Sequence, residues 1–64
     1  MTNLKIGSLY FDKSWKEWII ILSIDADGEI KTWVYDDEKS NINYFNVTFL
    51  KRWIENDTIT LEVE

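Results

Sequence analysis

Polar and apolar residues alternate along most of this chain, with the two-residue period that is typical of β-strands. The second stretch of alternation is the most apolar, because hydrophobic side chains occupy both of its sides through the centre. Strands of that kind lie in the middle of a sheet, or curl so that their two halves serve different cores. The pattern predicts strands at residues 4–11, 15–25, 29–35, 42–45 and 58–63.

The connections between these stretches contain turn residues, and one of them changes from the two-residue period of a strand to the spacing of a helix. The segment Asp25–Glu29 contains an Asp-Gly pair, which supplies the positive φ angles of a tight hairpin turn. Gly7 predicts a bulge, or a close approach of another backbone segment, within the first strand. The polar residues 36–41 predict a loop or an extended hairpin tip. From Asn46 onward apolar residues recur at helical spacing, which predicts a short helix that begins at Asn46 and ends at Asn56.

The predicted order of elements is β-β-β-β-α-β, within a single small domain that spans residues 1–64. Short, hairpin-like connections favour an antiparallel sheet, whose edges must close on each other or be covered. We therefore predict a mostly β fold: a five-stranded antiparallel SH3-like barrel with one short helix before the last strand. The alternative is an open antiparallel meander with the helix packed on one face. The two arrangements differ mainly in whether the last strand pairs with the first.

Composition narrows the possible classes of function. Four Trp, three Tyr and three Phe allow a dense core in a chain of 64 residues. The absence of Cys and His removes disulfides, the commonest zinc ligands and the usual catalytic base, so we expect no enzyme activity, no metal site and no cofactor. No apolar run approaches the roughly 20 residues of a membrane span and no secretory signal is visible, so we expect a cytoplasmic protein. The net charge of −5 disfavours direct binding to nucleic acid.

Two acidic clusters fall in the predicted turns. The first resembles part of a calcium-binding loop, but it lacks the ligand spacing and the flanking helices of an EF-hand. We interpret both clusters as solvated turns, with the alternative that they face a basic partner. The clusters consist of Asp25, Asp27 and Glu29, and of Asp36, Asp37 and Glu38.

An aromatic surface is the most suggestive functional feature of the sequence. Trp33 and Tyr35 lie on one side of the third strand. The opposite side is also apolar, so one of the two sides forms the core. We expect Ile19 and Ile21 of the preceding strand on the same side as these rings, with Lys31 nearby. If the helix leaves that side uncovered, it is a candidate partner-binding surface, because Trp and Tyr are enriched in binding hot spots. The alternative is that the helix covers these rings and makes them part of the core.

These features lead to three hypotheses about function. The first is a non-catalytic protein-binding module or small inhibitor that docks through the aromatic side, with the acidic turns steering it toward a basic partner. The second is an acidic mimic of nucleic acid that occupies the cationic groove of a DNA- or RNA-binding protein. The third is a homodimer joined through the apolar side. Frequent Ile, Asn and Lys also suggest an AT-rich genome, so we expect a bacterial or phage-encoded protein in a bacterial or infected host cell.

Overall fold

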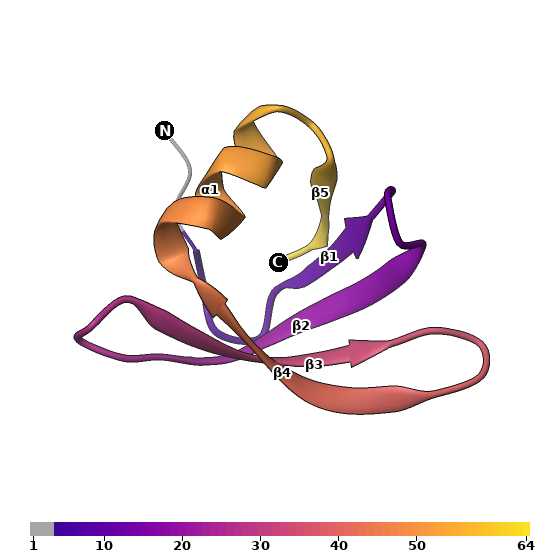
Figure 1. Ribbon diagram of the computed structural model, residues 1–64, viewed down its shortest axis with the longest axis horizontal. Helices are drawn as coiled ribbons and strands as arrows, with labels where there is room; N and C mark the ends of the chain where they lie inside the picture. Colours follow the sequence, from indigo (N-terminus) through magenta and orange to yellow (C-terminus); the bar gives the residue numbers. More distant parts are fainter. Residues whose placement is uncertain (1–3) are drawn as a thin grey trace.

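The computed structural model describes residues 4–64, in which five strands form one antiparallel sheet and a single helix precedes the last strand (Figure 1). The strands are β1 (Leu9–Asp12), β2 (Glu17–Ile24), β3 (Glu29–Tyr35), β4 (Ser40–Asn46) and β5 (Ile59–Val63), and the helix is α1 (Val47–Glu55). Their order across the sheet is β4-β3-β2-β1-β5. The predicted mostly β class and the predicted order of elements along the chain are confirmed.

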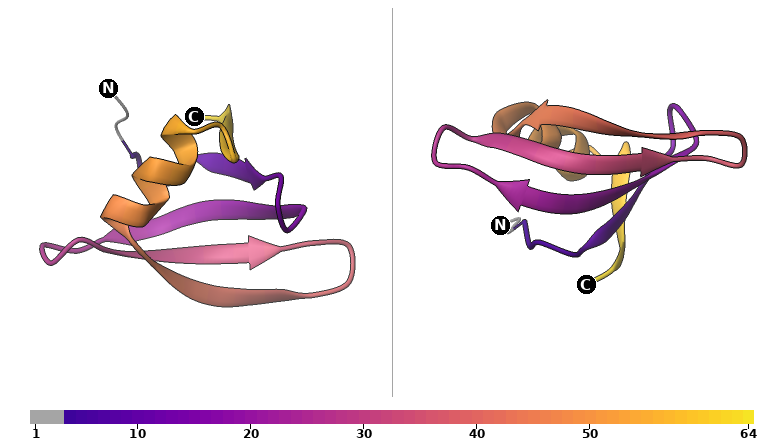
Figure 2. Two further views of the ribbon diagram at one scale, coloured as in Figure 1. Left: turned by 45° about the horizontal axis from the view of Figure 1, so that its top comes forward. Right: turned by 90° about the horizontal axis from the view of Figure 1, so that it is seen from below.

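The sheet is open, and β4 and β5 form its two edges. The last strand pairs with the first, as the barrel prediction expects, with Asp12 opposite Ile59. No pairing joins β5 to β4 within residues 4–64, so the pairing of β5 with β1 does not by itself distinguish a barrel from an open sheet. Instead α1 leads from one edge strand to the other over one face of the sheet (Figures 1 and 2). The prediction of a closed barrel is therefore wrong, and the alternative of an open meander with its helix on one face is confirmed. The helix fills the space into which the two edges would have to curl in order to meet.

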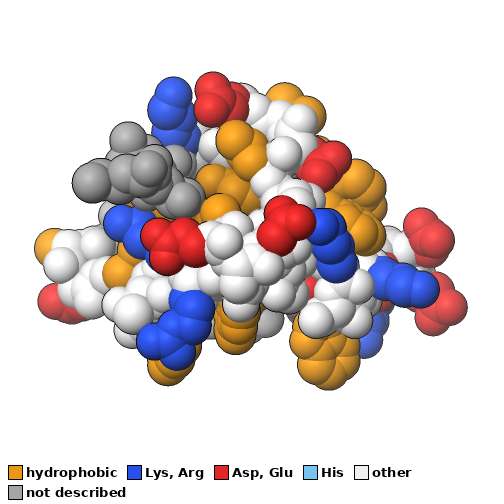
Figure 3. Space-filling view, turned by 90° about the horizontal axis from the view of Figure 1, so that it is seen from above, with side chains coloured by type: hydrophobic (Ala, Val, Ile, Leu, Met, Phe, Trp, Pro, Cys, Tyr) orange, Lys and Arg blue, Asp and Glu red, His pale blue; other side chains and the backbone are white. Residues whose placement is uncertain are grey.

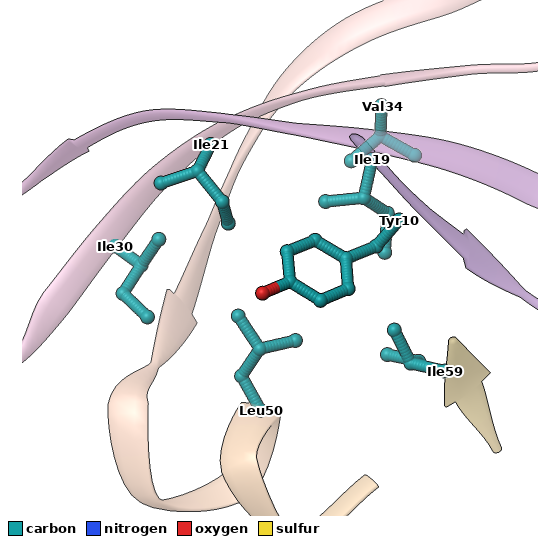
Figure 4. Packing of buried hydrophobic residues seen from close by; sticks show 7 residues of the cluster. All are labelled: Tyr10, Ile19, Ile21, Ile30, Val34, Leu50 and Ile59. Atoms are coloured by element: carbon teal, nitrogen blue, oxygen red, sulfur yellow. The ribbon is translucent and has the colours of Figure 1, made fainter. Parts of the chain in front are cut away.

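The face of the sheet that packs against α1 forms the hydrophobic core (Figure 4). The ring of Tyr10 lies at its centre, between the side chains of β2 and Leu50 of the helix. Leu50 is the fully buried residue of α1, and Ile59 closes the core from β5. The hydroxyl of Thr32 is buried beside them and donates a hydrogen bond to the carbonyl oxygen of Asn43 at 2.8 Å. The buried hydrophobic set is Tyr10, Ile19, Ile21, Ile30, Val34, Leu50 and Ile59.

The first strand is shorter than its alternation predicts, because the chain turns before it. Gly7 has a φ angle of +90°, and the amide of Ser8 donates to the carbonyl oxygen of Lys5 at 3.2 Å. The Gly7 amide donates to the carbonyl oxygen of Ile21 at 2.8 Å. A Cβ atom at Gly7 would meet nothing within 4 Å, so the glycine is needed here for its positive φ angle and not for a close backbone approach. The prediction of a strand over residues 4–8 is therefore wrong, and β1 begins only after this turn.

The start of α1 is tied to the β2–β3 hairpin. The side chain of Asn46 accepts a hydrogen bond from the amide of Thr48 at 2.8 Å, and Asn56 follows the last turn, so both predicted ends of the helix are confirmed. The amide of Val47 donates to the carbonyl oxygen of Gly28 at 2.8 Å. Gly28 has a φ angle of +83°, and a Cβ atom at this position would lie 3.0 Å from Val47 Cγ1. The predicted Asp-Gly hairpin turn therefore also packs against the first turn of the helix and forms a hydrogen bond with it.

Leu50→Ala is expected to lower the free energy of unfolding by about 3 kcal/mol, because it leaves a cavity where α1 meets the sheet. The matched control is Phe49→Ala, whose ring is half-exposed and is expected to contribute less than about 1 kcal/mol. Urea unfolding followed by tryptophan fluorescence measures both variants. Equal losses would contradict the assignment of Leu50 as the core contact of the helix.

The pKa of the Tyr10 phenol is raised above its ordinary value of 10.0, first by burial and further by the negative charge of Glu64. The unfolded chain therefore releases this proton at lower pH than the folded protein does. It follows that the free energy of unfolding falls as the pH rises past 10.0 toward the raised pKa. Tyr10→Phe is expected to remove this part of the alkaline loss. Urea unfolding at several pH values between neutral and alkaline tests it, and parallel curves for the two proteins would refute the expectation.

Candidate functional site

The face of the sheet opposite α1 carries two rows of large side chains that run across the strands. The first row consists of successive cross-strand partners on β1 to β4, namely Leu9, Ile20, Trp33 and Ile42. The second row consists of Phe11, Trp18 and Tyr35. Cross-strand partners project from the same side of a sheet, so the two rows form one continuous surface. Together with Tyr44, these residues are named here the aromatic face.

Three members of the aromatic face are exposed to solvent, and the others are partly exposed. Trp33 is 40% exposed, Ile42 is 41% exposed and Tyr44 is 56% exposed. The rings of Phe11 and Trp18 pack against each other with their centroids 4.7 Å apart, so the surface is a packed layer of side chains. Within residues 4–64 no element covers it, because α1 lies behind the sheet when this face is viewed (Figure 2, right).

The structure brings together part of the predicted partner-binding set. Trp33, Tyr35 and Lys31 lie on the aromatic face, where they alternate with the buried side of β3. Ile19 and Ile21 are 1% and 0% exposed in the core on the opposite face. The prediction that these two isoleucines share a side with the two rings is therefore wrong.

A β-bulge in the pairing of β2 with β3 explains this error. Ile24 pairs with Ile30 next to the hairpin turn, and the register then shifts by one residue. Beyond the shift, Ile20 rather than Ile21 lies opposite Trp33. One extra residue in a strand exchanges the side chains that point to each face. Because both sides of β2 are apolar, its sequence gives no sign of this exchange.

The alternative that the helix covers Trp33 and Tyr35 is also wrong, because Leu50 packs on the other face. Sequence reasoning missed the remaining members of the aromatic face. Ile42 and Tyr44 alternate with asparagines along β4. This alternation marks the apolar side of the strand and is the feature of the sequence from which these two residues could have been predicted. The missed residues are Leu9, Phe11, Trp18, Ile20, Ile42 and Tyr44.

The two acidic clusters lie at opposite ends of β3, in the turns that precede and follow it (Figure 1). In the first turn, Oδ1 of Asp25 accepts hydrogen bonds from two backbone amides at 3.0 and 2.9 Å. In the second, Oδ1 of Asp36 accepts from the amides of Glu38 and Lys39 at 2.8 and 2.9 Å, and these bonds hold the pKa of Asp36 below its ordinary value of 3.8. Among residues 4–64, no three acidic side chains are grouped closely enough to hold a metal ion. Asp25 and Asp36 therefore shape their turns.

A groove opens on the α1 side of the sheet, where the β1–β2 turn, β4 and the helix come together, with a volume of about 460 Å³. Its lining includes the aromatic rings of Trp15, Phe45 and Trp53. Asp12 also lines it and is buried, and its Oδ1 accepts hydrogen bonds from the amides of Ser14 and Trp15 at 2.9 and 3.3 Å. The carboxylate of Asp12 thus holds the β1–β2 turn, and with it one wall of the groove.

No protein-family model, curated protein or solved structure matches this chain. In the described part of the chain, no helix has the length and the apolar character that crossing a membrane requires. The functional assignment therefore depends on the aromatic face, the acidic turns and the groove.

Asp12→Ala is expected to lower the free energy of unfolding by about 2 kcal/mol, because it removes a charged acceptor from two amides of the β1–β2 turn. Asp12→Asn keeps a side-chain oxygen in the same place and is expected to lose less than half as much. Thermal unfolding followed by circular dichroism compares the two variants. If they were equally destabilised, the hydrogen bonds to the turn would not be the source of the effect.

Proposed function

We propose that this chain is a non-catalytic protein-binding module, or a small inhibitor, that docks on a protein partner through the aromatic face. The observation that supports the proposal is an uncovered surface across four strands, on which Trp18, Trp33 and Tyr35 lie among aliphatic side chains. Small proteins seldom leave a large contiguous apolar patch in water unless it serves an interface. Trp and Tyr are also the residue types that most often dominate binding energy.

Charge indicates the chemistry of the partner. The chain has a net charge of −5, and its acidic turns border the aromatic face at both ends of β3. A complementary surface has an apolar centre and lysine or arginine at its rim. Charges at a rim mainly raise the rate of encounter, whereas the buried rings supply most of the affinity. We place this activity in the cytoplasm of a bacterial or infected host cell.

The same surface supports a second candidate, which is a homodimer. The observation in its favour is the length of the apolar rows, which run from β1 to β4 without an intervening charge in the first row. Two copies related by a two-fold axis would bury this surface against itself. In that case the assembly, rather than the free chain, is the functional unit.

The acidic mimic of nucleic acid stays a prediction with less support from the arrangement of the carboxylates. They are divided between the two ends of β3, so the length of this strand separates them (Figure 1). Asp25 and Asp36 are moreover engaged by the backbone of their own turns. A cationic groove would have to contact both ends of the hairpins at once.

Combining Trp33→Ala with Tyr35→Ala is expected to weaken partner binding at least about 30-fold, because truncating one hot-spot aromatic residue costs about 2 kcal/mol or more. A pull-down with tagged protein from a bacterial lysate, at low and high salt, identifies the partner. Calorimetry with the purified partner then gives the affinity. Phe49→Ala removes a half-exposed ring from α1, away from the aromatic face, and serves as the control that retains binding.

Several outcomes would decide against the proposal. A double variant that no longer folds by circular dichroism would show that the two rings belong to the core. Capture that survives both substitutions but disappears at high salt would favour the acidic mimic. A dimer by sedimentation equilibrium that both substitutions dissociate would favour the homodimer.

A further inference from the structure

The groove on the α1 side differs in character from the aromatic face, which lies on the other side of the sheet. Three aromatic rings and two carboxylates meet in its lining, and they come from the β1–β2 turn, the strands and the helix. These side chains are Trp15, Phe45, Trp53, Asp12 and Glu17. Figure 3 shows the α1 side, on which hydrophobic and charged side chains lie next to each other in the right half of the view. The combination of rings and carboxylates is typical of sites for organic cations.

The rings of Phe45 and Trp53 form a corner. Their planes are 88° apart and their centroids are separated by 6.2 Å. Trp15 adds a third ring, 76% exposed, on a turn whose backbone is held by the carboxylate of Asp12. A cation is attracted to the electron-rich face of an aromatic ring, and this attraction grows as water is excluded. The corner therefore offers an aromatic surface to a cation together with the apolar carbons that carry it.

The two acidic residues of the groove occupy opposite positions on neighbouring strands. Asp12 and Glu17 are cross-strand partners at the ends of β1 and β2, and both line the groove. Like charges at such positions destabilise a sheet. Within residues 4–64 neither carboxylate forms an ion pair, since the pairs present involve other residues. A cation bound in the groove would supply a positive charge to both acidic residues, and Asp12 is buried from water.

We propose that this groove binds an arginine side chain of a basic segment in a partner protein. A guanidinium group is planar, so it stacks on aromatic rings and donates parallel hydrogen bonds to carboxylates, which an ammonium group does less well. The volume of about 460 Å³ leaves room for the side chain and the neighbouring backbone. Lys39 also lines the groove and opposes the binding of a cation. The proposal does not depend on docking at the aromatic face.

The test uses N-acetyl-arginine methylamide as the probe and the complete chain as the protein. Binding is followed by the NMR signals of the indole N–H groups of Trp15 and Trp53 during titration. We expect saturable shifts with a dissociation constant on the order of 1 mM, as befits a single side chain. N-acetyl-citrulline methylamide has nearly the same shape without the charge, and it is expected to bind about tenfold more weakly because it lacks the charge-assisted hydrogen bonds.

Four substitutions test the site, and each has an expected effect on the affinity for the arginine probe. Trp15→Ala and Glu17→Gln are each expected to weaken binding of the arginine probe about threefold or more, through loss of a ring face or of a charge. Lys39→Gln is expected to strengthen it about twofold. Trp33→Ala, on the aromatic face, is the control and leaves the affinity unchanged. Glu17→Gln is also expected to make the free protein more stable, because it removes the repulsion from Asp12.

Equal binding of the citrulline probe, or a response to Ca²⁺ without a response to the arginine probe, would overturn the proposal. So would a tightening of binding in Glu17→Gln or a weakening in Lys39→Gln. Failure of the aromatic face to bind a partner would leave these results untouched, because the probe is a small molecule and the control substitution lies on the other side of the sheet. The two proposals therefore stand or fall separately.

Discussion

A single short helix has to cover a sheet that is apolar on both faces. The nine residues of α1 give it a length of about 14 Å, which is too short to extend across all five strands of the sheet. The helix therefore shields one face, and only part of that face. The core forms where Leu50 packs on the sheet, the groove forms beside Trp53 near the C-terminal end of the helix, and the aromatic face lies on the side without a helix. The surfaces to which we assign binding are thus consequences of how little helix the chain contains.

The period of the sequence predicts the type and order of the elements, and it predicts the limits of some of them. Strand β4 is longer than predicted, because Ser40 and Asn41 of the predicted loop pair with β3. The alternation of β3 gives its limits without error, and the two asparagines give both ends of α1, because capping and alternation are local properties. Strand β1 was predicted too long, because Gly7 permits a turn that alternation alone does not reveal. Closure of the sheet could not be predicted either, since it depends on where α1 rests between the distant edges.

The candidate sites were less predictable than the fold. The outward side of β3 was identified, but its neighbours on β2 were assigned to the wrong face because a bulge shifts the register between two apolar sides. The groove was not foreseen at all. Its members come from three separate parts of the chain, and the opposition of Asp12 and Glu17 appears only when β1 is paired with β2. Pairing between strands, rather than composition, decides both sites.

The hydrogen bond between Val47 and Gly28 implies an order of assembly. It encloses β3 and β4 in a loop of fewer than twenty residues, whereas pairing of Asp12 with Ile59 closes a loop of more than forty. Short loops lose less entropy on closure, so the hairpin and the first turn of the helix can fold as one local unit. The β1–β5 pairing is therefore expected to form after this unit. On this expectation Trp33 and Ile42 meet before the far edge of the sheet has been added.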